Sequence, residues 1–169
     1  KESLEDLTKE TIKRYSFPVK ITNASIDSLD KYDYPVQVKY NMQFDFEDQG
    51  MVYLNPMFSE ATTKNPFSSA ERQYPVEMPF KIAEMYILNM DIPKGYKVEE
   101  LPKSTRVKLN DNEGIFEYLI SATDKKIMLN SRIDIKKANF TPEDYQTLRD
   151  FFGYIVKKQA EQIVFKKIN

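Results

Sequence analysis

The chain contains no histidine, no cysteine and no tryptophan among its 169 residues. Serine and cysteine nucleophiles normally need a histidine base, and zinc and related metals are held mainly by histidine and cysteine. Both kinds of site are therefore excluded within this chain. Disulfide bonds are excluded as well, although the lack of cysteine does not separate the cytosol from the periplasm.

Glycine, long apolar runs and net charge are also scarce. Four glycines are too few for a glycine-rich phosphate loop. The chain has no apolar run of about 18 residues, which a membrane-spanning helix needs. The 25 basic and 26 acidic residues give a net charge of −1, so no basic surface is available for nucleic acid. We expect no cofactor, no nucleic-acid partner and no membrane insertion.

The amino-acid composition of the chain suits a single globular core. Hydrophobic residues make up 41% of the chain and charged residues 30%, which is typical of a folded domain of this length. The chain starts at Lys1 without a methionine or a signal peptide. We therefore expect residues 1–169 to form a single domain that has been cut from a longer protein.

The hydrophobic pattern predicts a helix followed by strands. Residues 1–15 place apolar side chains at helical spacing, whereas residues 16–139 alternate with a period of two. The clearest strand, 34–46, alternates Val36, Val38 and Tyr40 with polar residues, so we expect one face of it to be buried. Further strands are predicted at 17–21, 82–92, 105–109 and 127–135.

Turn signals separate these strands at spacings suited to hairpins. They lie at 48–50, 93–95, 111–114 and 123–126. About eight half-apolar strands are buried most economically in two stacked antiparallel sheets. The predicted fold is mainly β, an antiparallel β-sandwich with a short N-terminal helix and a longer C-terminal helix; a barrel is the alternative.

The longer helix is predicted over residues 140–163. Thr141 is placed as the N-cap and Pro142 at the first helical position, followed by two acidic residues. Apolar side chains then recur every three or four residues from Tyr145 to Ile155. This stripe predicts a helix that covers part of the sandwich, with Ile163 to Phe165 keeping the tail attached.

Alternation fails between Asn55 and Pro79, where four prolines crowd together. A long ordered loop of this kind is often functional. Arg72 is either a carboxylate clamp or a tie for loop carbonyls, and we favour the tie; Asn65 is interpreted as a turn former. Aromatic residues here anchor the core or stack on a ligand. The candidate interaction surface consists of Tyr53, Phe58, Asn65, Phe67, Arg72 and Tyr74.

Other polar groups do not make a convincing catalytic or metal site. Asp45, Glu47 and Asp48 suggest a glycosidase pair, but they continue a solvated strand face. The acidic residues at 27, 30 and 33 do not have the spacing of a calcium loop. Ser68 and Ser69 have no lysine at a fixed spacing. We therefore predict that the chain is not an enzyme and holds no metal.

Several motifs together resemble the C-terminal domain of unknown function that follows a transglutaminase-like domain in exported bacterial proteins. The resemblance covers most of the chain from about Tyr15. Its motifs are Asn65-Pro66-Phe67 with Arg72 and Tyr74 to Glu77, then Pro93 to Pro102, Phe116 to Tyr118, and Phe140 to Tyr145 continuing through Phe151-Phe152 to Val164.

The resemblance implies a compartment and a neighbour. The catalytic cysteine, histidine and aspartate of such proteins would belong to the preceding domain, and none can be placed in this chain. We expect a periplasmic or otherwise extracytoplasmic, non-catalytic accessory domain whose partner is the preceding domain of the parent chain. The alternative is a module that binds a glycan or a peptide on the 56–79 loop.

Overall fold

The computed structural model describes residues 4–13, 15, 18–45 and 50–168 and divides the chain into two compact units, Lys1–Asp48 and Gln49–Asn169. The sequence predicted one sandwich running from 16 to 139 instead. The predicted strand residues Phe17 and Phe46, the acidic residue Glu47 and the turn residues 48–49 lie outside the described part of the chain. Each unit is described by itself below.

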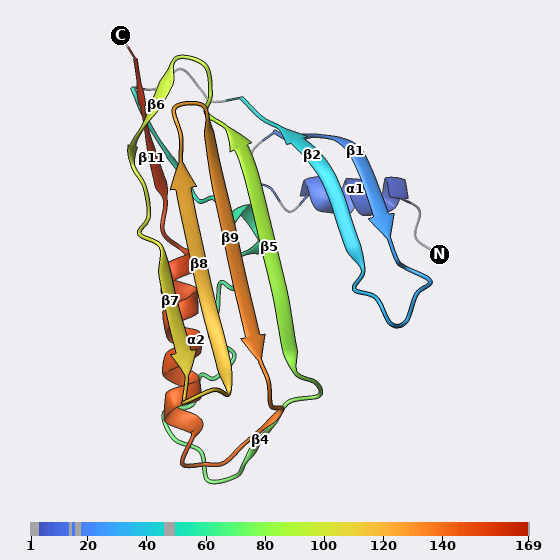
Figure 1. Cartoon of the computed structure of the whole chain (residues 1–169), viewed down its shortest axis with the longest axis vertical. Coiled ribbons are helices and arrows are strands. Elements are labelled where there is room, and N and C mark those ends of the chain that lie inside the picture. The colour runs from blue at the N-terminus through green and yellow to red at the C-terminus, as the bar shows by residue number, and fades with distance from the viewer. Residues whose placement is uncertain (1–3, 14, 16–17, 46–49, 169) are drawn as a thin grey trace. The chain divides into compact units, whose positions relative to one another are not determined.

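The first unit is a helix with a two-stranded antiparallel sheet (Figure 1). Its elements are α1 (Leu4–Lys13), β1 (Lys20–Asp27) and β2 (Gln37–Gln43). The helix was predicted correctly, but Val36 and Val38 are exposed, so the expectation of a buried face is wrong at these two positions. Among its described residues only Thr11 is buried, with its hydroxyl donating to the Leu7 carbonyl oxygen at 2.8 Å.

The second unit is built on a four-stranded antiparallel sheet in the order β5-β9-β8-β7. The turns at 111–114 and 123–126 join paired strands, as predicted. The predicted strands 82–92, 105–109 and 127–135 are confirmed as β5, β7 and β9, whereas β8 was not named. The strands are β5 (Ile82–Asp91), β7 (Thr105–Leu109), β8 (Gly114–Ala122) and β9 (Lys126–Ile135).

Gly114 begins β8 at a position where a side chain does not fit. A Cβ atom there would lie 2.9 Å from the Asp134 carbonyl oxygen and 3.3 Å from Leu109 Cβ. Real Cβ atoms do not approach a backbone oxygen so closely. The glycine therefore permits the tight pairing of β8 with β9 at this end of the sheet.

A three-stranded sheet, β3-β11-β6, and a short pair, β10-β4, complete the strands. The turn at 93–95 was expected to make a hairpin, but β5 and β6 belong to different sheets, so it carries the chain from one sheet to the other. Gly95 takes a positive φ of 82° there, which favours glycine. The strands are β3 (Met51–Leu54), β4 (Val76–Glu77), β6 (Tyr96–Glu100), β10 (Asn139–Phe140) and β11 (Ile163–Lys167).

The helix α2 (Tyr145–Gln159) is shorter than the predicted range of 140–163. Asp144 takes the N-cap position in place of Thr141, and Phe140 belongs to β10. Beyond Gln159 the chain returns to an extended form as β11, because Ile163 to Lys166 pair with β3. A short 3-10 helix, η1 (Phe58–Glu60), follows β3.

The core lies on the α2 side of the four-stranded sheet, where Figure 1 shows α2 behind β7 and β8. The alternating pattern of β8 and β9 turns one set of side chains inward, and the apolar stripe of α2 meets them. Fully buried members are Leu109, Phe116, Tyr118, Ile127, Leu129, Ile135, Leu148 and Ile155. The predicted fold class, mainly antiparallel β with a short first helix and a longer second one, is confirmed.

Candidate functional site

Asn65 forms a turn and also fastens the 55–79 loop to α2. Its Oδ1 accepts a hydrogen bond from the Phe67 backbone N–H at 2.9 Å, which closes the turn across Pro66. Its Nδ2 donates to the Arg149 carbonyl oxygen at 2.8 Å. The predicted turn-forming role is confirmed, and the anchor on the helix is additional.

Asn55 repeats this arrangement ten residues earlier and was missed. Its Oδ1 accepts from the Met57 N–H at 2.8 Å, and its Nδ2 donates to the Gln159 carbonyl oxygen at 2.9 Å. A proline follows the asparagine in both turns, and the next residue, Met57 or Phe67, is buried. The repeated Asn-Pro dipeptide was the available sequence signal.

The remaining predicted aromatic residues separate into core and surface positions. Phe67 packs edge-to-face on Tyr145 and Phe152, with ring centroids 6.2 and 5.1 Å away, so it anchors the loop in the core. Phe58 is half-buried, whereas Tyr53 and Tyr74 are exposed. Phe67 therefore cannot offer its ring to a ligand without leaving the core.

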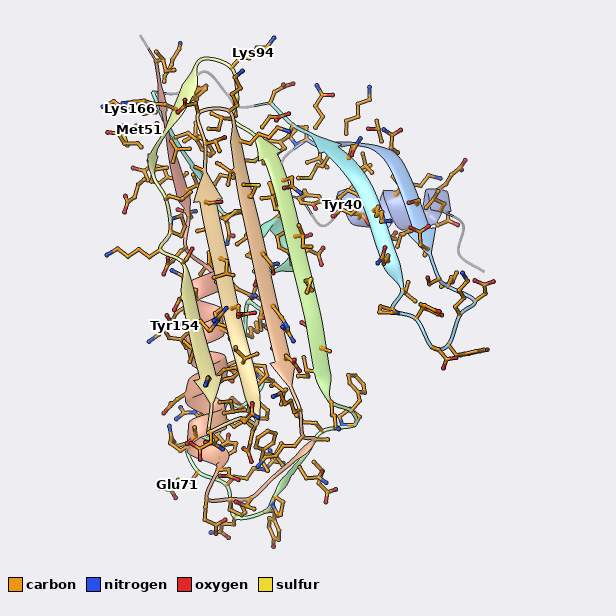
Figure 2. The ribbon with its side chains drawn as sticks, in the orientation of Figure 1. Tyr40, Met51, Glu71, Lys94, Tyr154 and Lys166 are labelled. Atoms are coloured by element: carbon orange, nitrogen blue, oxygen red, sulfur yellow. The ribbon has the colours of Figure 1, made fainter. Side chains whose placement is uncertain are left out.

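Arg72 does not tie down the loop. It is exposed and forms no hydrogen bond or ion pair with any residue that the structure describes. The Tyr145 hydroxyl instead donates to the Ser69 carbonyl oxygen at 2.9 Å. Figure 2 places Glu71, in this loop, and Met51, at the start of β3, at opposite ends of the unit. The part of the loop that carries Arg72 and the strand that carries Tyr53 thus lie at opposite ends of the unit.

The acidic residues considered from the sequence are exposed wherever the structure describes them, as expected for a solvated face. Asp45 is exposed, and the other two members of its group lie outside the described residues. Asp27 is paired with Lys39 at 3.0 Å across the β1–β2 sheet. No group of three or more acidic residues in the described ranges is arranged to hold a metal ion. Nor is any described helix long and apolar enough to cross a membrane.

Gln159 is a buried polar centre that joins three parts of the second unit. It is 2% exposed. Its Oε1 accepts from the Thr62 N–H at 2.7 Å, its Nε2 donates to Ser131 Oγ at 3.2 Å, and its carbonyl oxygen accepts from Asn55. This centre connects the loop, β9 and α2. The spacing of four residues from Ile155 to Gln159 places Gln159 on the inward stripe of the predicted helix, but its three hydrogen bonds could not be predicted.

Next to it, Lys158 lies above the ring of Tyr118. The Lys158 amino group is 5.3 Å from the ring centroid and donates to Glu161 Oε2 at 2.6 Å. The Tyr118 hydroxyl is buried and has no hydrogen-bond partner among the described residues. Burial, with a smaller contribution from the Glu161 charge, raises the pKa of Tyr118 well above its usual value.

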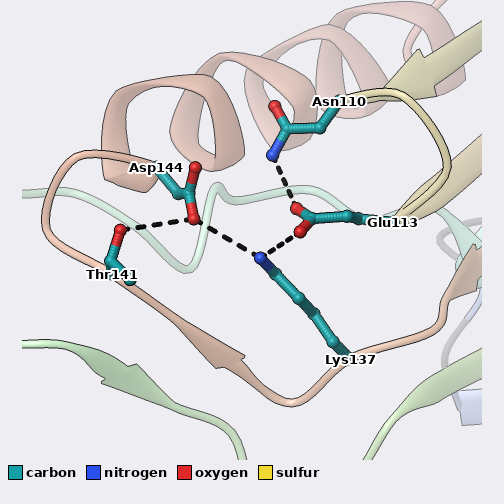
Figure 3. Close-up of polar contacts among 5 residues, drawn as sticks. All are labelled: Asn110, Glu113, Lys137, Thr141 and Asp144. Atoms are coloured by element: carbon teal, nitrogen blue, oxygen red, sulfur yellow. Dashed lines mark hydrogen bonds and ion pairs between the residues drawn. The ribbon is translucent and has the colours of Figure 1, made fainter.

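At the other end of α2, Lys137 connects two turns (Figure 3). Its amino group pairs with Glu113 in the β7–β8 turn and with Asp144 at the start of α2. Partial burial opposes its charge, but the hydrogen bonds to the two carboxylates raise the pKa of Lys137 overall. Asn110 Nδ2 donates a hydrogen bond to the Glu113 carboxylate, and the Thr141 hydroxyl donates one to the Asp144 carboxylate. This network links the β7–β8 turn to the N-terminal end of α2.

The outer face of the four-stranded sheet, opposite α2, carries an apolar surface that we call the outer patch. Strand registers bring its members together, since Ile87 and Leu119 both flank Asn130, and Met128 lies opposite Asn89. Exposed apolar groups of this kind mark interaction sites when they are contiguous. The outer patch consists of Met85 (61% exposed), Ile87 (60%), Leu119 (41%) and Met128 (45%).

A row of ion pairs borders the outer patch on the same face. Arg106 Nε lies 2.6 Å from Glu117 Oε1, and Arg132 reaches Asp134 at 2.6 Å and Glu117 at 3.8 Å. Met85 lies directly opposite Arg132 in the register. The apolar patch with a charged border has the composition expected of a protein–protein contact.

Comparison with known proteins finds a longer protein with a similar fold. A crystal structure from Parabacteroides distasonis, described as a "putative protease", matches 70% of this chain with a TM-score of 0.56 and 18% identity. The match spans 24% of that longer chain. At this identity the likeness concerns the fold. No curated protein matches the chain.

A family model covers most of the second unit, from residue 50 to residue 165. The match includes β3 through β11, and therefore both Asn-Pro turns, the outer patch and α2. The first unit lies outside it. The chain thus belongs to the domain family of unknown function DUF3858, for which a structure has been solved.

Proposed function

We propose that this chain is a non-catalytic accessory domain of a larger exported, transglutaminase-like protein, and that it docks on the preceding domain through the outer patch. The exposed apolar face of the four-stranded sheet carries the proposal. Four large apolar side chains lie there on a sheet, and their exposure to water is unfavourable in free energy unless a partner covers them.

Two further observations support an accessory role. The described residues do not bring together a nucleophile, a base and an oxyanion donor, and the whole sequence lacks histidine and cysteine. The matched crystal structure has this fold within a chain about four times the matched length. The transglutaminase-like neighbour and the extracytoplasmic location rest on the motif resemblance.

Methionine oxidation tests the docking surface directly, because Met85 and Met128 belong to the outer patch. We expect hydroxyl-radical footprinting to label both in the isolated 169-residue chain and to spare both in the parent protein. Met51 is the matched control, since it is 44% exposed but lies on β3, outside the patch. It should be labelled equally in both proteins.

Variants of the parent protein separate docking from general protection. Ile87→Glu should restore labelling of the two patch methionines, because a carboxylate cannot be buried unpaired against an apolar partner. Tyr74→Glu, at a more exposed position outside the patch, should not. Equal labelling of Met85 in the parent and the isolated chain would overturn the docking proposal, as would a gene that encodes no further domain.

The alternative, glycan or peptide binding on the 56–79 loop, is less well supported. Phe67 is committed to the core, and Tyr53 and Tyr74 are exposed on separate parts of the unit. A binding function is better supported elsewhere on the same unit, at Tyr154.

A further inference from the structure

Tyr154 stands between two hollows on the α2 side of the second unit. The first hollow, about 400 Å³, is lined by Asn65, Arg149, Asp150, Gly153 and Lys157 together with Tyr154. The second, about 530 Å³, lies where the chain passes from β6 to β7 and is lined by residues 100–105, Lys158, Glu161 and Tyr154. Figure 2 shows Tyr154 on α2 beside β7. We call the two hollows with this ring the Tyr154 groove.

The ring of Tyr154 is held in place while remaining accessible. It is 39% exposed. Its hydroxyl shares a hydrogen bond of 2.9 Å with Thr105 Oγ1, and its ring forms an edge-to-face pair with Phe116, with the ring centroids 6.3 Å apart. A fixed, half-exposed aromatic face binds at low entropic cost, since little side-chain freedom remains to be lost.

Gly153 forms the floor of the first hollow. It lies four residues after Arg149 and four before Lys157, so the three positions share one face of α2. Glycine destabilises a helix interior relative to alanine, and Gly153 does not take a positive φ that would require glycine. A Cβ atom there would contact only Asn65 Nδ2, at 3.6 Å. A methyl group therefore fits at this position, whereas a longer side chain would extend into the hollow.

The groove offers donors and acceptors of both charge signs. Arg149 and Lys157 face the first hollow with Asp150, and the second combines Lys103 and Lys158 with Glu100 and Glu161. Lys158 is buried and gives one hydrogen bond to Glu161, although an ammonium group carries three donors. Three hydroxyls line the groove as well and are held in place by the protein: Ser104 bonds to the backbone of Ile120, and Thr105 and Tyr154 bond to each other.

We propose that the Tyr154 groove binds a neutral oligosaccharide, with a sugar unit in each hollow and the ring of Tyr154 between them. Sugar hydroxyls donate and accept at once, which matches a lining that mixes carboxylates, ammonium groups and hydroxyls without a dominant sign. The apolar face of a sugar ring stacks on an aromatic side chain. The lining also includes Leu101 and Pro102, so a peptide is the competing ligand, and the test includes it.

Titration of the 169-residue chain with neutral oligosaccharides tests the proposal. The saccharide probes are cellohexaose, xylohexaose, maltohexaose and chitohexaose. A mixed pentapeptide library tests peptide binding. Calorimetry and two-dimensional NMR measure binding of each probe. At least one hexasaccharide should bind and shift the amide signals of α2 around Gly153. Binding by none of the four, or by the peptides instead, overturns the proposal.

Paired variants locate the binding in the groove. Tyr154→Ala should weaken the hexasaccharide at least 10-fold, whereas Tyr154→Phe, which keeps the ring, should stay within 3-fold. Gly153→Gln should weaken it at least 10-fold by filling the first hollow, whereas Gly153→Ala should leave it unchanged. Unfolding midpoints confirm that each variant is folded.

Unchanged binding by folded Tyr154→Ala contradicts the assignment, as does equal loss in Gly153→Ala and Gly153→Gln. The groove and the outer patch lie on different sides of the four-stranded sheet. Ile87→Glu should therefore leave saccharide binding unchanged, so the two proposals can fail separately.

Discussion

At the scale of single residues, the Tyr118 hydroxyl destabilises the folded state, because it is buried and has no hydrogen-bond partner among the described residues. Burying an unbonded hydroxyl costs about 1–3 kcal/mol. Tyr118→Phe should therefore raise the free energy of unfolding, by about 1 kcal/mol. Tyr145→Phe is the control and should lower it by about 1 kcal/mol, since that hydroxyl donates to Ser69. Urea unfolding measures both, and a large destabilisation by Tyr118→Phe would contradict the prediction.

The same hydroxyl predicts a loss of stability at alkaline pH. Below pH 10 it is protonated in both states and contributes no pH dependence. Above pH 10 the unfolded tyrosine ionises while the folded one, with its raised pKa, keeps its proton, so unfolding becomes progressively easier. The pKa of Lys137 is also raised in the folded state, so the stability that its charge contributes is likewise lost as the pH rises above about 10.5.

Urea midpoints between pH 9 and 11.5 check this dependence. The fall with pH should be shallower in Tyr118→Phe than in the unaltered chain. An identical slope in Tyr118→Phe and the unaltered chain would assign the alkaline loss to other groups.

At the scale of elements, the two Asn-Pro turns decide how the 55–79 loop is held. Asn65→Ala removes the acceptor of the Phe67 N–H and the donor to the Arg149 carbonyl oxygen. Asn55→Ala removes the acceptor of the Met57 N–H and the donor to the Gln159 carbonyl oxygen. Each should lower the free energy of unfolding by about 1–2 kcal/mol. Asn65→Asp keeps the acceptor and should retain exchange protection of the Phe67 amide. Loss of protection in Asn65→Asp as well would show that the bond to α2 is the one that matters.

The elements that sequence could predict are those with a strong local pattern. β7 alternates because one face meets the core and the other meets water; β5 and β9 keep the same inward phase, although Met85, Ile87 and Met128 on their outer face are apolar. β11 escaped notice because its partners, β3 and β6, lie more than 60 residues away, and nothing in Ile163 to Lys167 shows that pairing. The helix does not start at Thr141 as predicted, because residues 141–144 form a turn in which the Asp144 N–H donates to the Thr141 carbonyl oxygen, and α2 follows it.

The candidate sites show the same limit. Asn65 was predicted as a turn former because its neighbours in sequence make the turn. The Tyr154 groove could not be predicted, since it forms where α2 meets the β6–β7 connection about 50 residues away. Gly153 was the one local sign, a glycine inside an otherwise strong helical stripe.

At the scale of the whole molecule, the two units should differ in stability when separated. The second unit contains nearly all of the buried side chains, whereas Thr11 is the buried one in the described part of the first. A fragment of residues 49–169 should unfold cooperatively with native-like circular dichroism. A fragment of residues 1–48 should not, because so small a core cannot offset the chain entropy. Cooperative unfolding of the shorter fragment would contradict this expectation.

The position of β11 also has a consequence for the order of assembly. It is the middle strand of β3-β11-β6, yet it follows both neighbours in the chain. While the polypeptide is being synthesised, β3 and β6 must wait with open edges until β11 leaves the ribosome. Such long-range closure raises contact order and slows folding. The nascent chain therefore passes through a stage with two unpaired strand edges, at which a chaperone that shields edges would have the most effect.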